Sequence, residues 1–345
     1  MSINLDPKLP RVLVALGGKS TERSVSIGTG EAVANALERL GYSVGIIDIG
    51  TGSLMQTPEL QTVEKDASKL PAVSNIPLID IKRHFELVFI AMHGKFGEDG
   101  GLQSLLEYCS IPYTGSNPFA SALSMDKKHS KIVLKASGIP VPEGQTITKE
   151  DEKITIPFPV VVKPNDQGSS VGVSFCQSEA EGKLGVKQAL QYSNEALVEP
   201  CIFGKELTVL VIDDVEGKPK ALPVIEIITQ KEHKIFDNKA KYDGTTEETC
   251  PAKISNSLTE KAQKYAVSAY QALGCRHFAR IDMMVDQQEN IYVLEANSIP
   301  GLTGESLSPK ATKAAGMTYE QFIDHIVKIA LKDQRGLQKD TDKLE

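Results

Sequence analysis

The sequence lacks a long hydrophobic run and an excess of positive charge, and each absence excludes a class of protein. No stretch of about 18 consecutive apolar residues occurs among the 345 residues, so no membrane-spanning helix is predicted. The N-terminal residues are polar and lack the apolar segment of a signal peptide, so we expect a cytoplasmic protein. The formal net charge of −7 favours neither nucleic acid nor a membrane surface as a partner.

Cysteine and histidine are too sparse to indicate a disulfide framework or a zinc site. The five cysteines are odd in number and contain no C-x-x-C pair, which is typical of reduced thiols in a cytosolic protein. The six histidines show no metal-ligand spacing. The chain also has neither a Walker A motif nor the Rossmann fingerprint G-x-G-x-x-G, so a dinucleotide is not indicated.

The first third of the chain alternates short apolar runs with amphipathic segments. Such runs are typical of buried parallel strands, and the segments that follow them have helical spacing. This alternation indicates an α/β domain with a parallel sheet. Residues 51–77 are polar and irregular, which favours a surface excursion. The expected strands are 11–16, 42–49 and 86–91, and the expected helices are 26–40 and 101–109.

The rest of the chain predicts further strands and helices. A tight turn at 203–205 separates two strands, 196–199 and 206–212, which we expect to form a hairpin. The last stretch, 333–345, is charged, and we expect it to be frayed. The other expected elements are a strand at 159–164 and helices at 128–136, 260–273 and 319–331.

Two late strands joined by the polar turn 286–290 carry the most informative pattern. Centring a hairpin on this turn places Asp282 opposite Glu295. It also places Arg280 opposite Asn297, and strand alternation puts all of these side chains on one face. The opposite face, which we expect to pack in the core, receives Ile281, Met283, Leu294 and Ala296.

The polar face of this hairpin has a metal-binding composition. Two carboxylates directly across a ladder repel each other, and a hard divalent cation would remove that repulsion. Asp282 and Glu295 together with the amide of Asn297 suit Mg²⁺ that carries substrate phosphates rather than Zn²⁺. The alternative is a solvated face with paired surface charges. The turn-rich segment 298–307 follows the second strand, where ligands are commonly bound.

Three polar loops follow predicted strands. Lys163 precedes the Gly/Ser loop 168–172, which could surround an anion with backbone N–H groups or be an ordinary hairpin tip. His93 lies where open α/β sheets bind ligands, although a loop histidine commonly bonds only to backbone. Glu22 lies near a helix start, where it could stabilise the helix dipole or receive a substrate ammonium group.

Two further patterns are weak by themselves. Glu199 and Glu206 flank the turn at 203–205. Lys241 and Tyr242 lie in a polar stretch without periodicity, which is either a surface loop or a mobile lid over a site.

Taken together, these segments resemble the D-alanine–D-alanine ligase family of ATP-grasp enzymes, from about residue 12 to 329. Each motif is modest, and their joint occurrence in this order is highly specific. The motifs are GGxSxERxVS (17–26), HGxxGEDGxxQ (93–103), IPYTGS (111–116), ASAxxMDK (120–127), VKPxxxGSSxG (162–172), DxxAKY (237–242), CPA (250–252), RxD (280–282) and ExNxxPGxTxxSL (295–307).

This resemblance implies an architecture of α/β and α+β parts. We expect an N-terminal Rossmann-like substrate-binding domain at 1–124, followed by a two-subdomain ATP-grasp fold. The central subdomain is expected at 125–206 and the C-terminal subdomain, with the metal site, at 207–332. ATP would lie between their sheets, and the family is usually homodimeric.

The resemblance also implies a reaction. The carboxylate of a first D-alanine would attack the γ-phosphate of ATP, and the amine of a second would attack the resulting acyl phosphate, for peptidoglycan precursor synthesis. The alternatives are a ligase for D-lactate or D-serine, or a non-catalytic ATP-binding regulator on the same scaffold. Tyr242 favours an amine acceptor, whereas Glu305 departs from the small or neutral residue common in the family.

By the same resemblance, each site residue has an expected role. Lys127 and Lys163 would bind ATP phosphates, and Glu199, Ile202 and Glu206 would hold adenine and ribose. Asp282, Glu295 and Asn297 would bind two Mg²⁺ ions, with Mn²⁺ as a substitute.

The substrate residues are expected around the same nucleotide. Glu22 would bind the first ammonium group, with His93 nearby, and Glu22, Ser169 and Tyr242 would form a hydrogen-bonded triad that links site to lid. Arg280 and the Gly301 N–H would stabilise the oxyanion. Ser306, the Leu307 N–H and Lys241 would hold the carboxylate of the second D-alanine.

Overall fold

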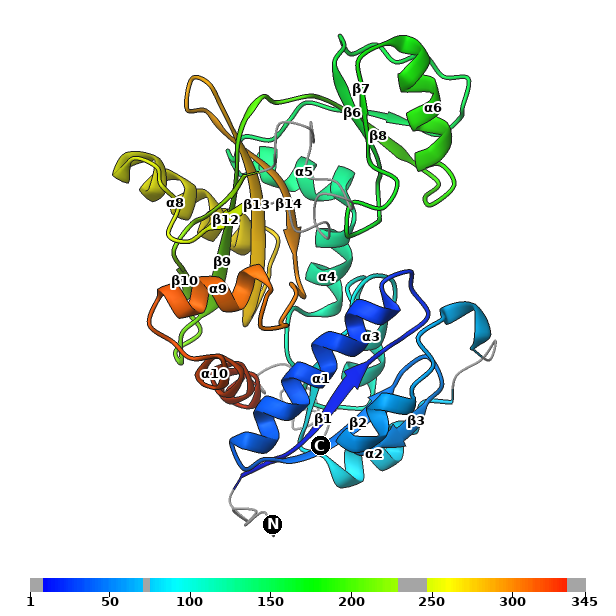
Figure 1. Ribbon diagram of the computed structural model, residues 1–345, viewed down its shortest axis with the longest axis vertical. Helices are drawn as coiled ribbons and strands as arrows, with labels where there is room; N and C mark the ends of the chain where they lie inside the picture. The colour runs from blue at the N-terminus through cyan, green and yellow to red at the C-terminus, as the bar shows by residue number, and fades with distance from the viewer. Residues whose placement is uncertain (1–8, 71–74, 229–246, 334–345) are drawn as a thin grey trace, which may run out of the picture.

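The computed structural model describes residues 9–70, 75–228 and 247–333, and they form three sheets (Figure 1). The N-terminal sheet lies at one end of the molecule, and the sheet that carries β6, β7 and β8 lies at the other. A larger sheet that contains β9, β13 and β14 lies between them.

The N-terminal sheet has the predicted parallel core, because β1 pairs in parallel with β2 on one side and with β4 on the other. Its central strand is almost wholly buried, as its apolar run requires. The stretch expected to be irregular also contains an antiparallel edge strand and two 3₁₀ helices, Thr57–Thr62 and Ala67–Lys69. The strand order is β3 (Ser53–Met55), β2 (Ser43–Asp48), β1 (Arg11–Leu16) and β4 (Leu87–Ile90), and the helices are α1 (Arg23–Arg39), α2 (Leu78–His84) and α3 (Gly101–Tyr108).

The second sheet is antiparallel and has a small core of its own. Residues of α6 (Glu179–Ala189) belong to that core, and Ser178 caps the helix by accepting a hydrogen bond from the Glu181 N–H. The strand order is β5 (Gln145–Ile147), β8 (Ala196–Pro200), β6 (Val160–Pro164) and β7 (Ser174–Cys176).

The third sheet is buried on both faces. One face packs against α8 and α5, whereas the other shares a core with α10 and with α1 of the N-terminal domain. Its strands are β12 (Glu247–Thr249), β11 (Ile225–Ile228), β9 (Gly204–Asp213), β13 (Phe278–Asp286) and β14 (Ile291–Asn297) in that order, with β10 (Pro219–Ala221) beside β9. The surrounding helices are α4 (Pro118–Met125), α5 (Lys127–Ala136), α8 (Asn256–Ala272), α9 (Leu307–Ala314) and α10 (Tyr319–Lys332).

The predicted hairpin between the strands at 196–199 and 206–212 is wrong. The first strand, β8, pairs with β5 and β6 in the second sheet. The second strand, β9, pairs with β13 along its whole length and with β10 and β11 on its other edge. Because both edges of each strand are already paired, the short link 201–203 carries the chain from one sheet to the other.

The predicted register of the late hairpin is confirmed. Asp282 pairs with Glu295 and Arg280 pairs with Asn297 across β13 and β14. A register shift after Asp282 then reverses the alternation, so Leu294 lines a cavity although we expected it in the core. Val293 takes the core position and is fully buried. A bulge of this kind re-aims side chains, which strict alternation cannot foresee.

Candidate functional site

Loops and strands from all three sheets line a cavity of about 870 Å³. Every predicted site residue that the structure describes lines it, whereas Lys241 and Tyr242 lie outside the described residues. The lining set is Glu22, His93, Lys127, Lys163, Ser169, Glu199, Ile202, Glu206, Arg280, Asp282, Glu295, Asn297, Gly301, Ser306 and Leu307.

The polar face of β13 and β14 forms one wall of this cavity. The Arg280 guanidinium makes two parallel hydrogen bonds to Asp282, Nε to Oδ1 at 2.8 Å and Nη2 to Oδ2 at 2.7 Å. Thr208 Oγ1 donates to the same Oδ1 at 2.5 Å. Burial opposes the charge on Arg280, but Asp282 and Glu295 outweigh it and raise the pKa of the guanidinium.

The oxygens on this wall fit a hard divalent cation. The Oδ1 atom of Asn297 is buried and has no hydrogen-bond partner among the described residues, an arrangement that buried polar atoms rarely tolerate. Asp282 and Glu295 provide carboxylates beside it. Within the described ranges no group of three or more His, Cys, Asp or Glu residues could hold a metal, so this site needs further ligands. Mg²⁺ meets that need with water and phosphate oxygens.

Three buried lysines, which we call the lysine cluster (Lys127, Lys131 and Lys163), lie close to another wall. Lys127 and Lys163 line the cavity, whereas Lys131 contacts Glu199, which also lines it. Lys163 Nζ lies 2.8 Å from Glu199 Oε2, and Lys131 pairs with the other oxygen of Glu199. Lys127 Nζ lies 3.1 Å from Glu295 Oε2 and donates to the carbonyl of Gln167 at 2.6 Å. Lys127 and Lys163 thus present positive charge to the cavity, which suits a polyanion.

Burial and mutual repulsion make these lysines easier to deprotonate. The pKa of Lys163 is lowered to about 8, by burial first and then by Lys127, although Glu295 opposes the shift. Burial likewise lowers the pKa of Lys131, with repulsion from Lys163 adding to it. Lys131 was not predicted from the sequence. The available signal was its position four residues after Lys127, which puts both on one face of α5.

Glu22 and Ser169 meet across the cavity from loops far apart in sequence. Glu22 is the N-cap residue of α1, but its side chain makes no capping hydrogen bond. Its carboxylate instead accepts a hydrogen bond from Ser169 Oγ. Ser169 has φ of 49°, a left-handed conformation that is uncommon for residues other than glycine. The Gly/Ser loop is therefore bound to the start of α1 rather than being a free hairpin tip.

Two further buried groups surround Glu22. His93 Nε2 lies 2.8 Å from Thr29 Oγ1, and burial lowers the pKa of His93 to about 4, so its ring is neutral at pH 7. Glu98 accepts the Gly94 N–H at 2.5 Å. Burial first, and then repulsion by Glu22, raises the pKa of Glu98 well above its usual range. Glu98 belongs to the HGxxGEDGxxQ motif, but its role was not predicted.

A turn before α9 closes the cavity at its other end. Ser306 is the N-cap residue of α9, and its Oγ accepts the Thr303 N–H at 3.1 Å. A Cβ atom at Gly301 would lie 2.8 Å from Ser306 Oγ, so only glycine leaves Ser306 in place. Glu305, in contrast, is at the rim with its side chain 97% exposed, 4.0 Å from Lys310.

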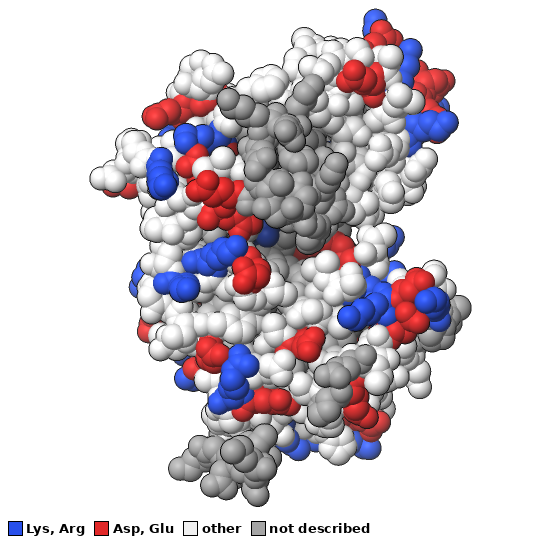
Figure 2. All heavy atoms as spheres, in the orientation of Figure 1, with Lys and Arg blue, Asp and Glu red and all other residues white. Residues whose placement is uncertain are grey.

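The visible surface outside the cavity gives no indication of a further binding site for a polyanion. Figure 2 shows acidic and basic side chains scattered over the visible face, without a broad patch of positive charge. Among the described residues, no helix combines the length and apolar character needed to span a membrane.

Comparison with known proteins gives concordant matches. Residues 11–116 match the family model described as D-ala D-ala ligase N-terminus, and residues 133–328 match D-ala D-ala ligase C-terminus. The D-alanine–D-alanine ligase of Carboxydothermus hydrogenoformans is 38% identical, over 94% of this chain and 99% of its own.

Solved structures of similar proteins agree with these matches. The D-alanine–D-alanine ligase of Bacillus anthracis, complexed with ATP, is 30% identical with a TM-score of 0.77, over 94% of this chain and 99% of its own. The VanG D-Ala:D-Ser ligase of Enterococcus faecalis is 28% identical with a TM-score of 0.79, over 94% of this chain and 100% of its own.

Proposed function

Because the chain belongs to the D-alanine–D-alanine ligase family, we propose that it joins two D-alanines into D-alanyl-D-alanine with consumption of ATP. Its fold is an N-terminal Rossmann-like domain followed by an ATP-grasp fold. The observation that carries the proposal is the cavity in which Lys127 and Lys163 lie beside the carboxylates of β13 and β14. That combination suits a nucleotide triphosphate.

ATP is the co-substrate, and we assign its phosphates to the lysine cluster. Positively charged groups fixed around the transferring phosphoryl group lower the barrier by positioning it and by neutralising charge. The adenine and ribose are assigned to the link between the second and third sheets, which supports a nucleotide held between those sheets. The assigned residues are Ile202 of that link, Glu199 near the end of β8 and Glu206 near the start of β9.

Asp282, Glu295 and Asn297 would hold Mg²⁺, as two ions by the family resemblance, with Mn²⁺ as a substitute. The unpartnered Oδ1 of Asn297 supports this assignment. When bound, the ions would neutralise the negative charge that shifts during phosphoryl transfer. The protein groups around them fix the side chains, because Thr208 and Arg280 orient Asp282.

In the first step, a carboxylate oxygen of the first D-alanine attacks the γ-phosphorus of ATP and ADP leaves. We assign the ammonium group of this substrate to Glu22, whose carboxylate faces the cavity and is oriented by Ser169. The neutral ring of His93 lies in the same wall and adds no competing positive charge.

In the second step, the amine of the second D-alanine attacks the acyl phosphate, and phosphate leaves. Arg280 is assigned to the developing oxyanion together with the Gly301 N–H, because its guanidinium has five donors and Asp282 takes two of them. The start of α9, at Ser306 and the Leu307 N–H, suits the carboxylate of this substrate. Lys241 and Tyr242 stay predictions.

The wider context is part of the same proposal. The product would feed peptidoglycan precursor synthesis, and the enzyme would be a cytoplasmic homodimer. The five free cysteines support a reducing compartment. The divisions 1–124, 125–206 and 207–332 stay predictions, and the tail from residue 334 onward lies outside the described residues.

An acceptor assay tests the function directly. Phosphate release is measured with ATP, Mg²⁺ and D-alanine, and then with D-serine or D-lactate as the second substrate, over a range of pH. We expect D-alanine to be the preferred acceptor near neutral pH. Preference for D-lactate or D-serine would identify a related ligase instead, and no ADP formation at all would favour the non-catalytic regulator.

A further inference from the structure

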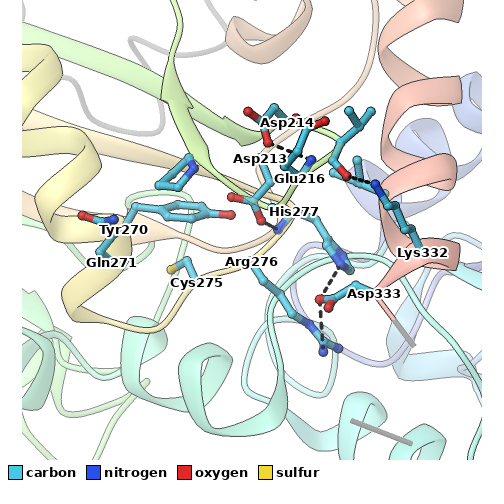
Figure 3. A pocket seen from close by; sticks show the side chains of 14 residues that line it. Asp213, Asp214, Glu216, Tyr270, Gln271, Cys275, Arg276, His277, Lys332 and Asp333 are labelled. Carbon is cyan, nitrogen blue, oxygen red and sulfur yellow. Dashed lines mark hydrogen bonds and ion pairs between the residues drawn. The ribbon is translucent and has the colours of Figure 1, made fainter. Parts of the chain in front are cut away.

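A second cavity, of about 540 Å³, lies beside the loop between α8 and β13, where Arg276 and His277 precede the strand that carries Arg280 (Figure 3). His277 has φ of 64° and is the centre of a γ-turn, in which the Phe278 N–H donates to the Arg276 carbonyl at 2.8 Å. The form of this turn with positive φ is rare and strained. Such strain persists only where the surroundings hold the residue in place.

Contacts from three other segments hold His277. Its backbone N–H donates to Asp213 Oδ2 at 2.7 Å, and its ring Nδ1 accepts the Gly115 N–H at 3.0 Å. Because Nδ1 accepts, the proton of the neutral ring is on Nε2, which lies 3.3 Å from Asp333 Oδ2. Figure 3 shows His277 between Asp213 and Asp333. The side chain is only 3% exposed, and its Nε2 makes no hydrogen bond among the described residues, so the hydrogen bonds with Asp213 and Gly115 fix the residue.

Arg276 binds residues 113–116, the segment that contains Gly115, through its side chain and its backbone N–H. Its Nε donates to the carbonyl of Gly115 at 3.0 Å, and its backbone N–H donates to Ser116 Oγ at 3.3 Å. The guanidinium also lies over the ring of Tyr113, 4.8 Å from the centroid. Arg276 and His277 therefore bind both the N–H and the C=O of Gly115.

The segment that they bind belongs to the N-terminal domain. Tyr113 forms a parallel bridge with Val88 of β4, and Thr114 Oγ1 accepts the Ile90 N–H at 3.0 Å. His93 is the third residue after the end of β4. Gly115 is thus tied at one end to the domain that carries Glu22 and His93, and through Arg276 and His277 to β13.

We propose that Arg276 and His277 are positioning residues, a clasp that fixes the N-terminal domain against β13 and thereby sets Glu22 opposite Arg280. This inference rests on the proposed function for its effect on substrates. The clasp touches neither substrate nor reacting atoms. The clasp matters because the two ends of the first D-alanine are assigned to different domains. Its ammonium group is assigned to Glu22 of the N-terminal domain, and its reacting carboxyl group to Arg280 of β13.

Three substitutions test the clasp, and the two at His277 separate its hydrogen bond from the backbone strain. His277→Gly removes the acceptor for the Gly115 N–H but adopts positive φ without strain. His277→Asn tolerates positive φ and keeps an acceptor oxygen near the position of Nδ1. Arg276→Lys keeps the charge but loses the Nε–H and the planar contact with Tyr113. Gln271→Ala, an exposed residue of the same cavity, is the matched control.

The first readout needs no substrate. Hydrogen exchange of residues 111–116 is measured in the ligand-free enzyme. We expect His277→Gly to accelerate exchange at Gly115 on the order of tenfold, the size expected when one buried donor loses its acceptor. Arg276→Lys should accelerate it less, and His277→Asn and Gln271→Ala should stay near wild type. Unchanged exchange in both His277→Gly and Arg276→Lys would overturn the clasp, whatever reaction the enzyme catalyses.

The second readout compares the KM for D-alanine with the KM for ATP. His277→Gly should raise the KM for D-alanine about tenfold, because Glu22 and Arg280 belong to different domains. The KM for ATP should change less than about twofold, because the residues assigned to ATP all lie outside the N-terminal domain. His277→Asn should restore the D-alanine KM. A parallel rise of both KM values, or no restoration by asparagine, would contradict the positioning role. If the His277 variants do not fold, the same comparison is made with Arg276→Lys.

Discussion

The two charged walls of the main cavity differ in a way that matches the two kinds of substrate. The lysine cluster pairs with Glu199 and Glu295, and two of its members, Lys127 and Lys163, present positive charge to the cavity. The wall around Glu22 instead holds a second acid, Glu98, and a neutral histidine. A polyanion suits the first wall and an ammonium group the second. The site thus separates nucleotide from amino acid by the sign of buried charge.

Loss of a carboxylate on the hairpin face should have the largest effect, because Glu295 is assigned to the metal and also pairs with Lys127. Glu295→Gln is expected to lower kcat by at least about a thousandfold, since metal-bound phosphate chemistry depends on this charge. Phosphate release gives the rate, and circular dichroism verifies the fold. Glu289→Gln, in the exposed turn of the same hairpin, is the control. Normal turnover of Glu295→Gln at ordinary Mg²⁺ would refute the metal assignment.

Removing one lysine should weaken the nucleotide wall alone. Lys131→Met is expected to raise the KM for ATP by about tenfold to a hundredfold, because Glu199, which lines the cavity, loses a neutralising partner and would repel the polyanion. The KM for D-alanine should change little. Lys135→Met, one turn further along α5 and ion-paired at the surface with Glu143, should resemble wild type. Equal changes in both KM values would remove the distinction between the walls.

The opposite substitution should weaken the amino-acid wall alone. Glu22→Gln is expected to raise the KM for D-alanine by about tenfold, since an amide neutralises no ammonium charge. ATP affinity, measured calorimetrically without D-alanine, should stay within about twofold of wild type. Glu31→Gln, exposed on the same helix, is the control. Lost ATP binding in Glu22→Gln would show that Glu22 serves the nucleotide.

The pH dependence of ATP affinity should be the smallest effect. The pKa of Lys163 is lowered to about 8, so the lysine is charged below that pH and loses its charge above it. The KM for ATP is therefore expected to rise as pH increases through about 8, by up to tenfold per unit for a single group. Lys163→Arg keeps its charge and should flatten the profile between pH 7 and 9. An identical rise in this variant would exclude Lys163 as the titrating group.

The hairpin face could be predicted because two short-range rules determine it. Alternation along β13 and the polar turn 286–290 together give the pairing of Asp282 with Glu295. The predicted core position of Leu294 was wrong because a bulge follows Asp282. The sequence pattern does not indicate where the register shifts. The roles of Glu22 and Ser306 came from the family resemblance, since a lone acid or serine is not specific.

Features that depend on tertiary structure could not be predicted from the sequence. The link at 201–203 has the length of a hairpin turn, but the competition of β5, β6, β10, β11 and β13 for the strand edges decides where each strand pairs. Lys131 was missed because its helical spacing from Lys127 is not specific, since exposed Lys135 follows Lys131 at the same spacing. Burial against Glu199 is what separates Lys131 from Lys135. The strained His277 gives no local signal, since positive φ here follows from its partners Asp213 and Gly115.

The arrangement of metal and nucleotide is tested most directly by a crystal structure with Mg²⁺ and a non-hydrolysable ATP analogue. The account predicts ion density contacting oxygens of Asp282, Glu295 and Asn297 and shared with the triphosphate, whose other oxygens meet the lysine cluster. An ion bound elsewhere, or these side chains turned away from the triphosphate, would contradict it.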